Sequence, residues 1–268
     1  MGAIAASLAR VDAGVSWLRV LAAAPDDRSG WVRCSDLLAD PLRLVDWQVE
    51  VADAYGGGDD NGRLTGAGLV LDWYLGAVTL PAAGIFHLDR RVPSLSPDTM
   101  LLRLGPGGTV VAVALESSAF RCLVDDPATD EAALVAADLG ELATGLRTEV
   151  VEHAERLLAA YAPTTRIGRH GRWGAVADAL DVAFLTGGWV SGDRARAAAD
   201  ARLVLGDGVG HLVGGSTLHE IVDDNGNWHW TRRRYSCCFV YRAPVGAVCV
   251  TCPRVSDEQR RHQATGWL

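Results

Sequence analysis

Hydrophobic residues recur every three or four positions through much of the chain, which is the spacing of a helix with one buried face. The pattern predicts helices over residues 8–24, 35–55, 130–162, 173–185 and 193–205. Ser35 is expected to cap the second of these helices. Pro163 is expected to stop the third, and Gly187 with Gly188 to close the fourth.

Other segments carry strand patterns. Residues 100–104 and 110–115 are rich in Val and Leu, and the turn sequence Gly-Pro-Gly-Gly between them predicts a hairpin. A third strand is predicted over residues 119–124, where Cys122 is expected to be a small core residue. Near the end, "HEIVDDNGNWHW" predicts a strand, a tight turn and a second strand, which leads directly into a cysteine-rich stretch.

These elements together predict an α+β protein, a mostly helical body with a small antiparallel sheet and a C-terminal cysteine-rich lobe. We expect residues 1–210 to form the helical body with its central β-hairpin, and residues 211–268 to form the lobe. A single large domain or two small ones both suit a chain of 268 residues.

Residues 64–88 are apolar over about the length of a membrane span. Asp72 lies in the middle of the segment, and a charge there costs about 3 kcal/mol in a spanning helix. We therefore predict that this segment is a buried helix, followed by a turn at Pro81, and that the chain has no transmembrane segment.

Charge narrows the range of partners. The formal net charge is −8, and the 25 basic residues are all arginine. An acidic chain of this kind argues against a nucleic-acid groove. Asp12, Asp26 and Asp27 interrupt any apolar leader near the start, so we expect a cytoplasmic protein whose thiols stay reduced.

Four of the six cysteines lie within one short stretch near the C-terminus, in the pattern CC-x10-C-x2-C; they are Cys237, Cys238, Cys249 and Cys252. Four thiolates suit either zinc or an iron–sulfur cluster. The adjacent pair favours the cluster, because neighbouring residues on a strand point to opposite faces and one small tetrahedral ion needs convergent ligands. A structural zinc site remains the alternative, whereas a disulfide is disfavoured in a reducing compartment.

The stretches "CCFVYR" and "CVTCP" resemble the C-terminal motif of the FhuF-type ferric-siderophore reductases. Arg233 and Arg234 before the double cysteine, Tyr241-Arg242 after it and a proline after the last cysteine also resemble the family pattern. The resemblance implies a 2Fe-2S cluster on the four cysteines. It further implies one-electron reduction of Fe(III) in a siderophore, of hydroxamate type, with release of Fe(II) in the cytoplasm.

The residues around the cysteines have two interpretations each. The arginines either tune the cluster potential or contact an anionic part of the substrate, and a solvated strand face is equally compatible with them. Trp228 and Trp230 are candidates for an aromatic wall against the substrate, although alternating aromatic residues on a strand more often pack across it.

No nucleotide-binding pattern accompanies the cysteines. The segment "GVGHLVGG" lacks the strand–helix context of a dinucleotide fingerprint, and His211, His219 and His229 follow no metal-ligand spacing. We therefore expect electrons to come from a ferredoxin-like protein. An iron–sulfur carrier or sensor that never meets a siderophore is the main functional alternative.

Overall fold

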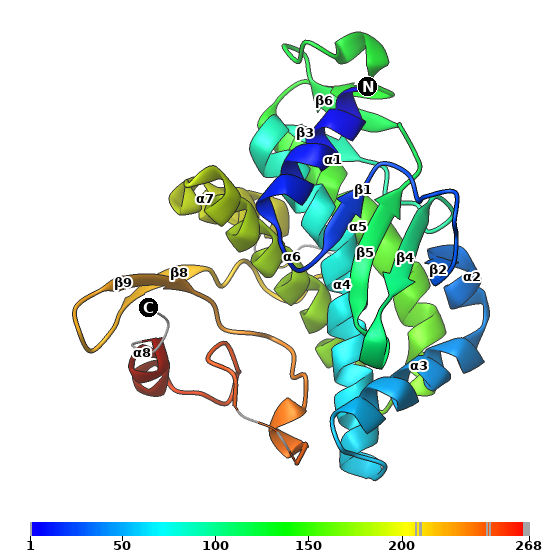
Figure 1. Cartoon of the computed structure of the whole chain (residues 1–268). Helices are drawn as coiled ribbons and strands as arrows, with labels where there is room; N and C mark the ends of the chain where they lie inside the picture. The colour runs from blue at the N-terminus through cyan, green and yellow to red at the C-terminus, as the bar shows by residue number, and fades with distance from the viewer. Residues whose placement is uncertain (1, 207, 209–210, 245, 247, 265–268) are drawn as a thin grey trace.

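A computed structural model describes residues 2–206, 208, 211–244, 246 and 248–264 of the chain. The protein is 54% helical, with small and mostly antiparallel sheets, which confirms the predicted α+β class. Figure 1 shows the helices α4 and α6 at the centre, with strands on one side and the C-terminal segment projecting from the other.

The helices of the described residues are α1 (Ala3–Gly14), α2 (Cys34–Ala39), α3 (Pro41–Ala54), α4 (Asp60–Asp89), α5 (Leu139–Tyr161), α6 (Arg169–Ser191), α7 (Arg194–Leu205) and α8 (Asp257–Ala264). Helix α4 packs against α6 over most of its length and also contacts α1, α3 and α5. Its side chains are buried on nearly all sides, as expected of a helix that is hydrophobic all round. It is therefore the core element on which the other layers rest.

Within the described residues, nine strands form three sheets. The strands are β1 (Arg19–Leu21), β2 (Trp31–Arg33), β3 (Arg91–Pro93), β4 (Met100–Leu104), β5 (Val110–Leu115), β6 (Phe120–Leu123), β7 (Leu134–Ala136), β8 (His219–Val222) and β9 (Trp228–Thr231). The largest sheet has the order β1-β5-β4-β2, with only β1 and β5 parallel. The second sheet is β3-β6-β7, and β8 with β9 forms a separate hairpin.

Aspartate caps start four of the helices. The carboxylates of Asp40, Asp59, Asp138 and Asp193 each accept a hydrogen bond from a backbone N–H in the first turn of α3, α4, α5 and α7. Such a cap satisfies a donor that has no partner inside the helix, and its loss costs about 1 kcal/mol. The helix starts are thus encoded by short polar residues placed directly before apolar runs.

The predicted limits of the first two helices are wrong. The first helix ends at Gly14, because the Asp12 carboxylate accepts the N–H of Val20 at 2.7 Å and turns the chain back as strand β1. The second divides into α2 and α3, because Pro41 has no N–H to continue a helix. Ser35 lies inside α2 and is not its cap, so that prediction is wrong as well.

Three later boundaries also differ from the predictions. Helix α4 runs straight through Pro81, where a turn was expected. Helix α6 runs through Gly187 and Gly188 to Ser191, because a Cβ at Gly188 would stand 2.8 Å from that of Ala197 and the glycines serve close packing. Helix α5 begins only at Leu139, because residues 134–136 pair with β6.

The predicted strands are confirmed more closely. Strands β4 and β5 have the predicted limits and pair as an antiparallel hairpin. Cys122 is fully buried on β6, although β6 belongs to a different sheet from the hairpin. The hairpin β8–β9 and helix α7 are also confirmed.

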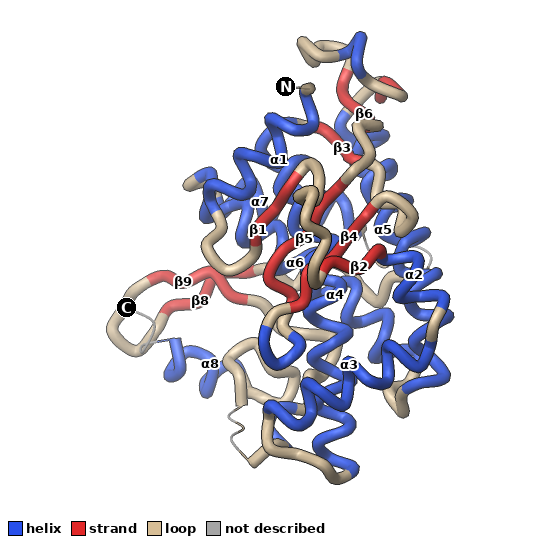
Figure 2. Tube along the Cα trace, turned by 45° about the vertical axis from the view of Figure 1, so that its right-hand side comes forward, coloured by secondary structure: helices blue, strands red, loops and turns tan. Residues whose placement is uncertain are grey.

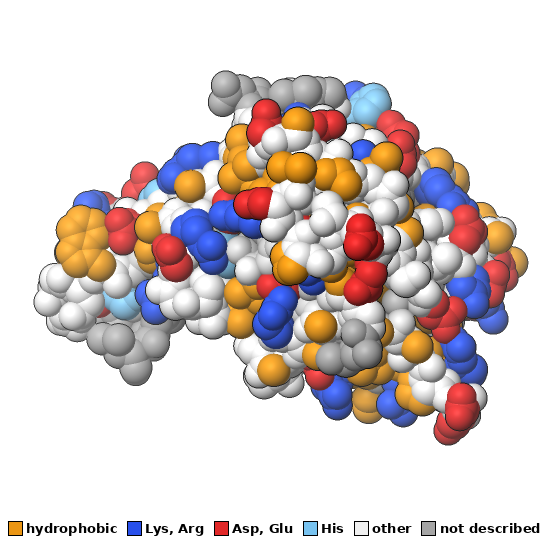
Figure 3. Space-filling view, turned by 90° about the horizontal axis from the view of Figure 1, so that it is seen from above, with side chains coloured by type: hydrophobic (Ala, Val, Ile, Leu, Met, Phe, Trp, Pro, Cys, Tyr) orange, Lys and Arg blue, Asp and Glu red, His pale blue; other side chains and the backbone are white. Residues whose placement is uncertain are grey.

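Helix α4 is, within the described residues, the one helix long and apolar enough to cross a membrane. However, 83% of its most apolar window is buried by the rest of the protein. Such burial is typical of a core helix, and the predicted buried helix is therefore confirmed for this segment. Acidic, basic and hydrophobic side chains are interspersed on the face that Figure 3 shows.

The C-terminal segment leaves the body as the β8–β9 hairpin, returns to it through residues 232–242 and ends in α8. Figure 1 and Figure 2 both place α8 beside the hairpin. His262 of α8 pairs with Asp224 of the hairpin turn at 2.8 Å, and the buried Arg260 donates to the carbonyl oxygen of Arg232 at 3.2 Å. The cysteines lie between these two elements.

Candidate metal centre

Cys237 and Cys238 lie in a turn that packs directly on α4. A Cβ at Gly68 of α4 would stand 2.7 Å from the carbonyl oxygen of Cys238, so only glycine lets the backbone approach this closely. Thr65, one turn earlier, donates its hydroxyl to the carbonyl oxygen of Phe239 at 3.2 Å. Phe239 itself has φ 60°, which reverses the chain after the double cysteine.

The second pair of cysteines forms its own tight turn. The N–H of Cys252 donates to the carbonyl oxygen of Cys249 at 2.9 Å, which brings the two ends of the CxxC segment together. The backbone N–H of Arg234 donates to the carbonyl oxygen of Thr251 at 3.0 Å. This bond joins the segment that leads into the double cysteine to the CxxC turn.

The four thiols are close enough to influence one another. Cys238 and Cys249 share a side-chain hydrogen bond, which lowers the pKa of Cys249 to about 5 and raises that of Cys238. Burial raises the pKa of Cys237, and the charges of Cys249 and Cys252 raise it further. Mutual repulsion of this kind is what a positively charged metal centre relieves.

The four cysteines of the motif differ in their exposure to solvent. Cys252 is buried, Cys237 and Cys238 are half-buried, and Cys249 is exposed. In the part of the chain that the structure describes, no three His, Cys, Asp or Glu side chains already converge as a metal-binding group. The donor set nevertheless fits an iron–sulfur cluster, because four free thiols lie on two adjoining turns and iron–sulfur clusters are held by thiolates.

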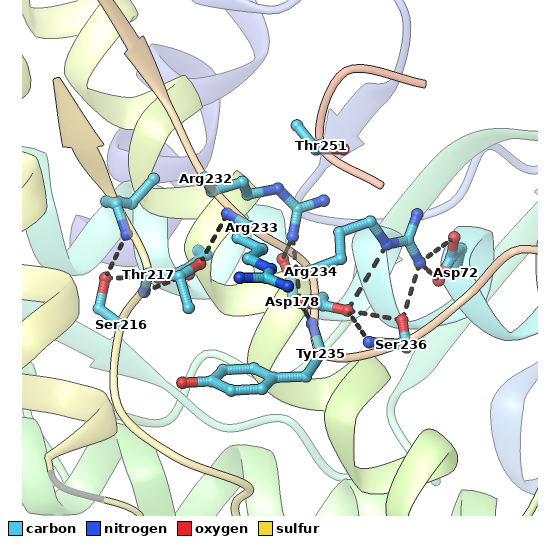
Figure 4. Close-up of polar contacts among 12 residues, drawn as sticks. Asp72, Asp178, Ser216, Thr217, Arg232, Arg233, Arg234, Tyr235, Ser236 and Thr251 are labelled. Carbon is cyan, nitrogen blue, oxygen red and sulfur yellow. Dashed lines mark hydrogen bonds and ion pairs between the residues drawn. The ribbon is translucent and has the colours of Figure 1, made fainter. Parts of the chain in front are cut away.

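The turn before the cysteines is anchored to α6 by Asp178. One carboxylate oxygen accepts the N–H of Tyr235 at 2.8 Å, and the other accepts the N–H of Ser236 at 2.8 Å and its hydroxyl at 2.5 Å. Figure 4 shows this carboxylate between the backbone turn and two arginines. Gly174, one helical turn earlier, leaves room for Tyr235, whose Cβ would lie 3.0 Å from an added methyl group.

Two buried arginines compensate the buried carboxylates. Arg234 donates to both oxygens of Asp72 at 2.6 Å and lies 3.5 Å from Asp178. Burial alone would lower the pKa of Arg234, but Asp72 and Asp178 raise it above the ordinary value, with a contribution from Cys238. Arg232 donates to the carbonyl oxygen of Asp178 at 2.7 Å, and burial lowers its pKa.

A third buried arginine supports the CxxC turn from α8. Arg260 is fully buried and donates to the carbonyl oxygens of Arg232, Cys252 and Val255 at 3.2 to 3.4 Å, and also to that of Val250. Helix α8 thus holds both sides of the cysteine segment through one guanidinium group.

The remaining predicted residues lie near the cysteines but differ in exposure. Arg233 and Arg242 are exposed, and Tyr241 is half-buried beside Arg242, whose Nε donates to the phenol oxygen at 2.9 Å. Trp228 is 67% exposed, whereas Trp230 is half-buried on the same strand.

Two adjoining cavities lie next to the buried arginines. The first, of about 360 Å³, is lined by Trp17 and Trp73 above a floor of Asp72, Asp178, Arg232 and Arg234. The second, of about 790 Å³, lies between α6 and the hairpin and is lined by Trp189, Trp228, Trp230 and Thr251. Both cavities also include Val182 and Arg232, and we refer to the two together as the tryptophan groove.

Comparison with known proteins identifies the class of the centre. Residues 234–254 match the family model described as the FhuF 2Fe-2S C-terminal domain, so the chain is an iron–sulfur protein whose cofactor is a 2Fe-2S cluster. This match confirms the resemblance of the C-terminal segment to the FhuF-type family that was found in the sequence. No curated protein sequence matches the chain, and the helical body lies outside the family match.

Sequence reasoning missed the residues that fix the cysteine turn. Asp72 was noticed only as a charge in an apolar helix, and Asp178, Gly68 and Arg260 were not singled out. Asp72 and Asp178 both interrupt otherwise apolar helical faces, which is the signal that each has a buried partner. The sequence does not say that the partner is Arg234 in both cases.

Replacing Asp178 with Asn keeps the size of the side chain but removes the charge that Arg232 and Arg234 face. We expect the free energy of unfolding to fall by about 3 kcal/mol, because the buried Arg232 loses its carboxylate partner and Arg234 keeps only Asp72. We also expect less iron per chain, since the turn before Cys237 loses its acceptor. Chemical denaturation and iron analysis of anaerobically purified protein measure the two effects.

Asp46→Asn is the matched control for this change, because Asp46 is exposed on α3. Its effect should stay within about 0.5 kcal/mol. If the two variants had the same stability and iron content, the anchoring role of Asp178 would be wrong.

The close approach of Cys238 to Gly68 gives a second test. In an open helix a Gly→Ala change stabilises by about 1 kcal/mol, and Gly76 of α4 has open space where its Cβ would stand. We expect Gly76→Ala to stabilise the protein and keep its cluster. Gly68→Ala should destabilise it and reduce the visible absorbance per chain, because the Cys238 backbone must move. Equal absorbance in the two variants would contradict this packing.

Proposed function

We propose that the protein is a cytoplasmic ferric-siderophore reductase, which delivers one electron to Fe(III) in a hydroxamate siderophore and so releases Fe(II). The C-terminal match associates the chain with iron–sulfur chemistry of the ferric-siderophore reductase type. The observation that carries the proposal beyond that match is the tryptophan groove, which adjoins the arginines that precede the double cysteine.

The ligands that we assign to the cluster are Cys237, Cys238, Cys249 and Cys252. When bound, a 2Fe-2S cluster supplies one electron at a time, at a potential that charge, hydrogen bonds and exposure set. The N–H of Phe239 already donates to the sulfur of Cys237 at 3.4 Å, and the hydroxyl of Thr251 lies 3.8 Å from the sulfur of Cys249. Both contacts favour the charged form of a thiol, which is the form that binds metal.

One electron suffices for iron release because the two oxidation states prefer different ligands. Hydroxamates are hard oxygen donors, which hold Fe(III) tightly and Fe(II) far less tightly. The protein therefore has to bind the whole chelate close to its cysteines, without having to remove the metal itself.

The tryptophan groove meets that requirement by size and chemistry. Its larger half, at about 790 Å³, falls within the range of small-molecule sites. Trp189 and Trp228 are more than half exposed, which leaves their rings free to pack on a ligand. Thr251, between Cys249 and Cys252, lines the same cavity, so a bound chelate lies against the cysteine segment.

The chain divides this work between two parts in our proposal. Residues 1–210 form a body that supplies one wall of the groove, including Trp17, Trp73 and Trp189. Residues 211–268 form the lobe that supplies the opposite wall and the cluster ligands. Arg233, Arg234, Tyr241 and Arg242 surround the cysteines, and of these Arg234 also borders the groove.

The ligand assignment is tested by single cysteine changes. Cys238→Ser should lose or destabilise the cluster, because serine oxygen is a poorer iron ligand than a thiolate. Cys122→Ser is the control, since Cys122 is buried on β6 in the body. Electron paramagnetic resonance of the reduced proteins, with iron and sulfide quantified, gives the result. An unchanged spectrum from the Cys238 variant would overturn the assignment.

The activity is tested by mixing anaerobically reduced protein with a ferric trihydroxamate. We expect the cluster absorbance to return to its oxidised form while Fe(II) accumulates and is trapped by a ferrous chelator. Absence of any reoxidation would leave only the roles of electron carrier or sensor.

The same reaction tests the groove. Replacing Trp189 and Trp228 with Ala should raise the KM for the ferric chelate by about tenfold, because two aromatic contacts are lost. The cluster potential should not change, since neither ring is a ligand. Leu42→Ala, which removes an exposed apolar side chain from α3, is the control and should leave KM unchanged. An unchanged KM in the tryptophan variant would place the substrate elsewhere.

A further inference from the structure

Three exposed arginines gather around the cysteine segment. Arg242 and Arg254 lie over the ring of Tyr241, at 5.6 Å and 4.7 Å from its centre. Arg233 donates to the carbonyl oxygen of Pro253, the neighbour of Arg254, at 3.4 Å. The three therefore form one continuous surface, which we call the arginine face.

The arginine face differs from the buried arginines in its ion pairs. Among the described residues, none of its three guanidinium groups forms an ion pair with a carboxylate, whereas the buried Arg232 and Arg234 both do. Glu258 of α8 lines the same cavity as Arg254 without pairing with it, and Asp257 pairs with Arg260 at 3.7 Å. Three uncompensated positive charges are unusual in a chain whose formal net charge is −8.

The arginine face also adjoins the exposed edge of the metal centre. Cys249 is the exposed member of the four cysteines, and Val248 before it is 42% exposed. Pro253 and Arg254 follow Cys252 directly, and Arg233 precedes Arg234, whose backbone N–H donates to the carbonyl oxygen of Thr251. A protein seated on this surface would lie against the most accessible ligand of the cluster.

We propose that the arginine face is the docking surface for an acidic one-electron carrier protein. The carrier gives up one electron and the cluster accepts it, with no proton or group transferred. Complementary charge steers such a partner, and the overall negative charge of the chain repels it from other surfaces.

This inference rests on the cysteine ligands proposed above but not on the siderophore. The tryptophan groove borders Arg232 and Thr251, whereas the arginine face includes neither of them. Donor and substrate therefore approach the centre over different surfaces. An electron can enter while the chelate is bound.

Binding is tested first, with the oxidised holoprotein and an oxidised plant-type ferredoxin as the acidic probe. Calorimetry should show an affinity that falls by about tenfold or more between 20 and 200 mM salt, because the contact is electrostatic. A basic cytochrome c is the control for the sign of the charge and should bind more weakly at low salt. Salt-independent binding, or tighter binding of the cytochrome, would overturn the proposal.

Electron transfer is tested with charge reversal. The variant carries both Arg242→Glu and Arg254→Glu. At low salt, its rate of cluster reduction by ferredoxin should fall by about tenfold relative to its rate of reduction by photoreduced deazariboflavin. Deazariboflavin is a small uncharged reductant, so charge reversal should not affect it. Arg43→Glu is the matched control, because Arg43 is exposed on α3, away from the lobe, and should leave this ratio unchanged. A parallel fall in both rates with a shift in potential would mean that the arginines only compensate the cluster charge.

The two proposals fail separately. Suppose that a ferric hydroxamate reoxidises the reduced protein, but that ferredoxin affinity changes neither with salt nor with charge reversal. The proposed docking surface is then wrong, and the proposed reductase activity is retained. If ferredoxin binds as described but the ferric chelate does not reoxidise the cluster, the proposed docking surface is retained and the protein is a carrier or sensor.

Discussion

The buried carboxylate of Asp178 is the constraint on which the metal centre depends. It binds two successive N–H groups of the turn before Cys237 and lies between Arg232 and Arg234. A buried charge is tolerated only while it is paired, and breaking such a pair costs about 3 to 5 kcal/mol. The cysteine turn therefore cannot leave α6 without exposing or orphaning charges on both sides. A loop with little regular structure is thereby held as firmly as the core helices.

The same network changes the interpretation of the arginines. From the sequence they were expected either to tune the cluster potential or to contact the substrate, and a solvated strand face was equally compatible with them. In the structure, Arg232 and Arg234 face Asp72 and Asp178, so two positive charges are matched by two negative ones. Arg234 nevertheless still favours the thiolate form of Cys237, Cys238 and Cys249. The two buried arginines therefore order the turn as well as acting on the thiols.

The sequence predicted what depends on local pattern and left out what depends on distant contacts. Strands β4 and β5, the β8–β9 hairpin and the cysteine motif all have short-range signals, and each was found. Pro81 and Gly188 were taken as helix ends because their local preference is to end helices, but packing against neighbouring helices overrides that preference. Asp178 and Gly68 matter only through partners about 60 and 170 positions away along the chain, which no window of sequence reveals.

In the proposed function, the tryptophan groove is the feature that a reductase needs and a simple carrier does not. A carrier needs one exposed edge of its cluster, and the region of Cys249 with the arginine face already supplies that edge. A bulky ferric chelate needs in addition a concave wall that holds it for the time of the transfer. Trp17 and Trp189 from the body and Trp228 from the lobe form such a wall beside the cysteine segment. Exposing three large aromatic rings in one groove is unfavourable unless a ligand covers them, so the groove itself argues for a substrate.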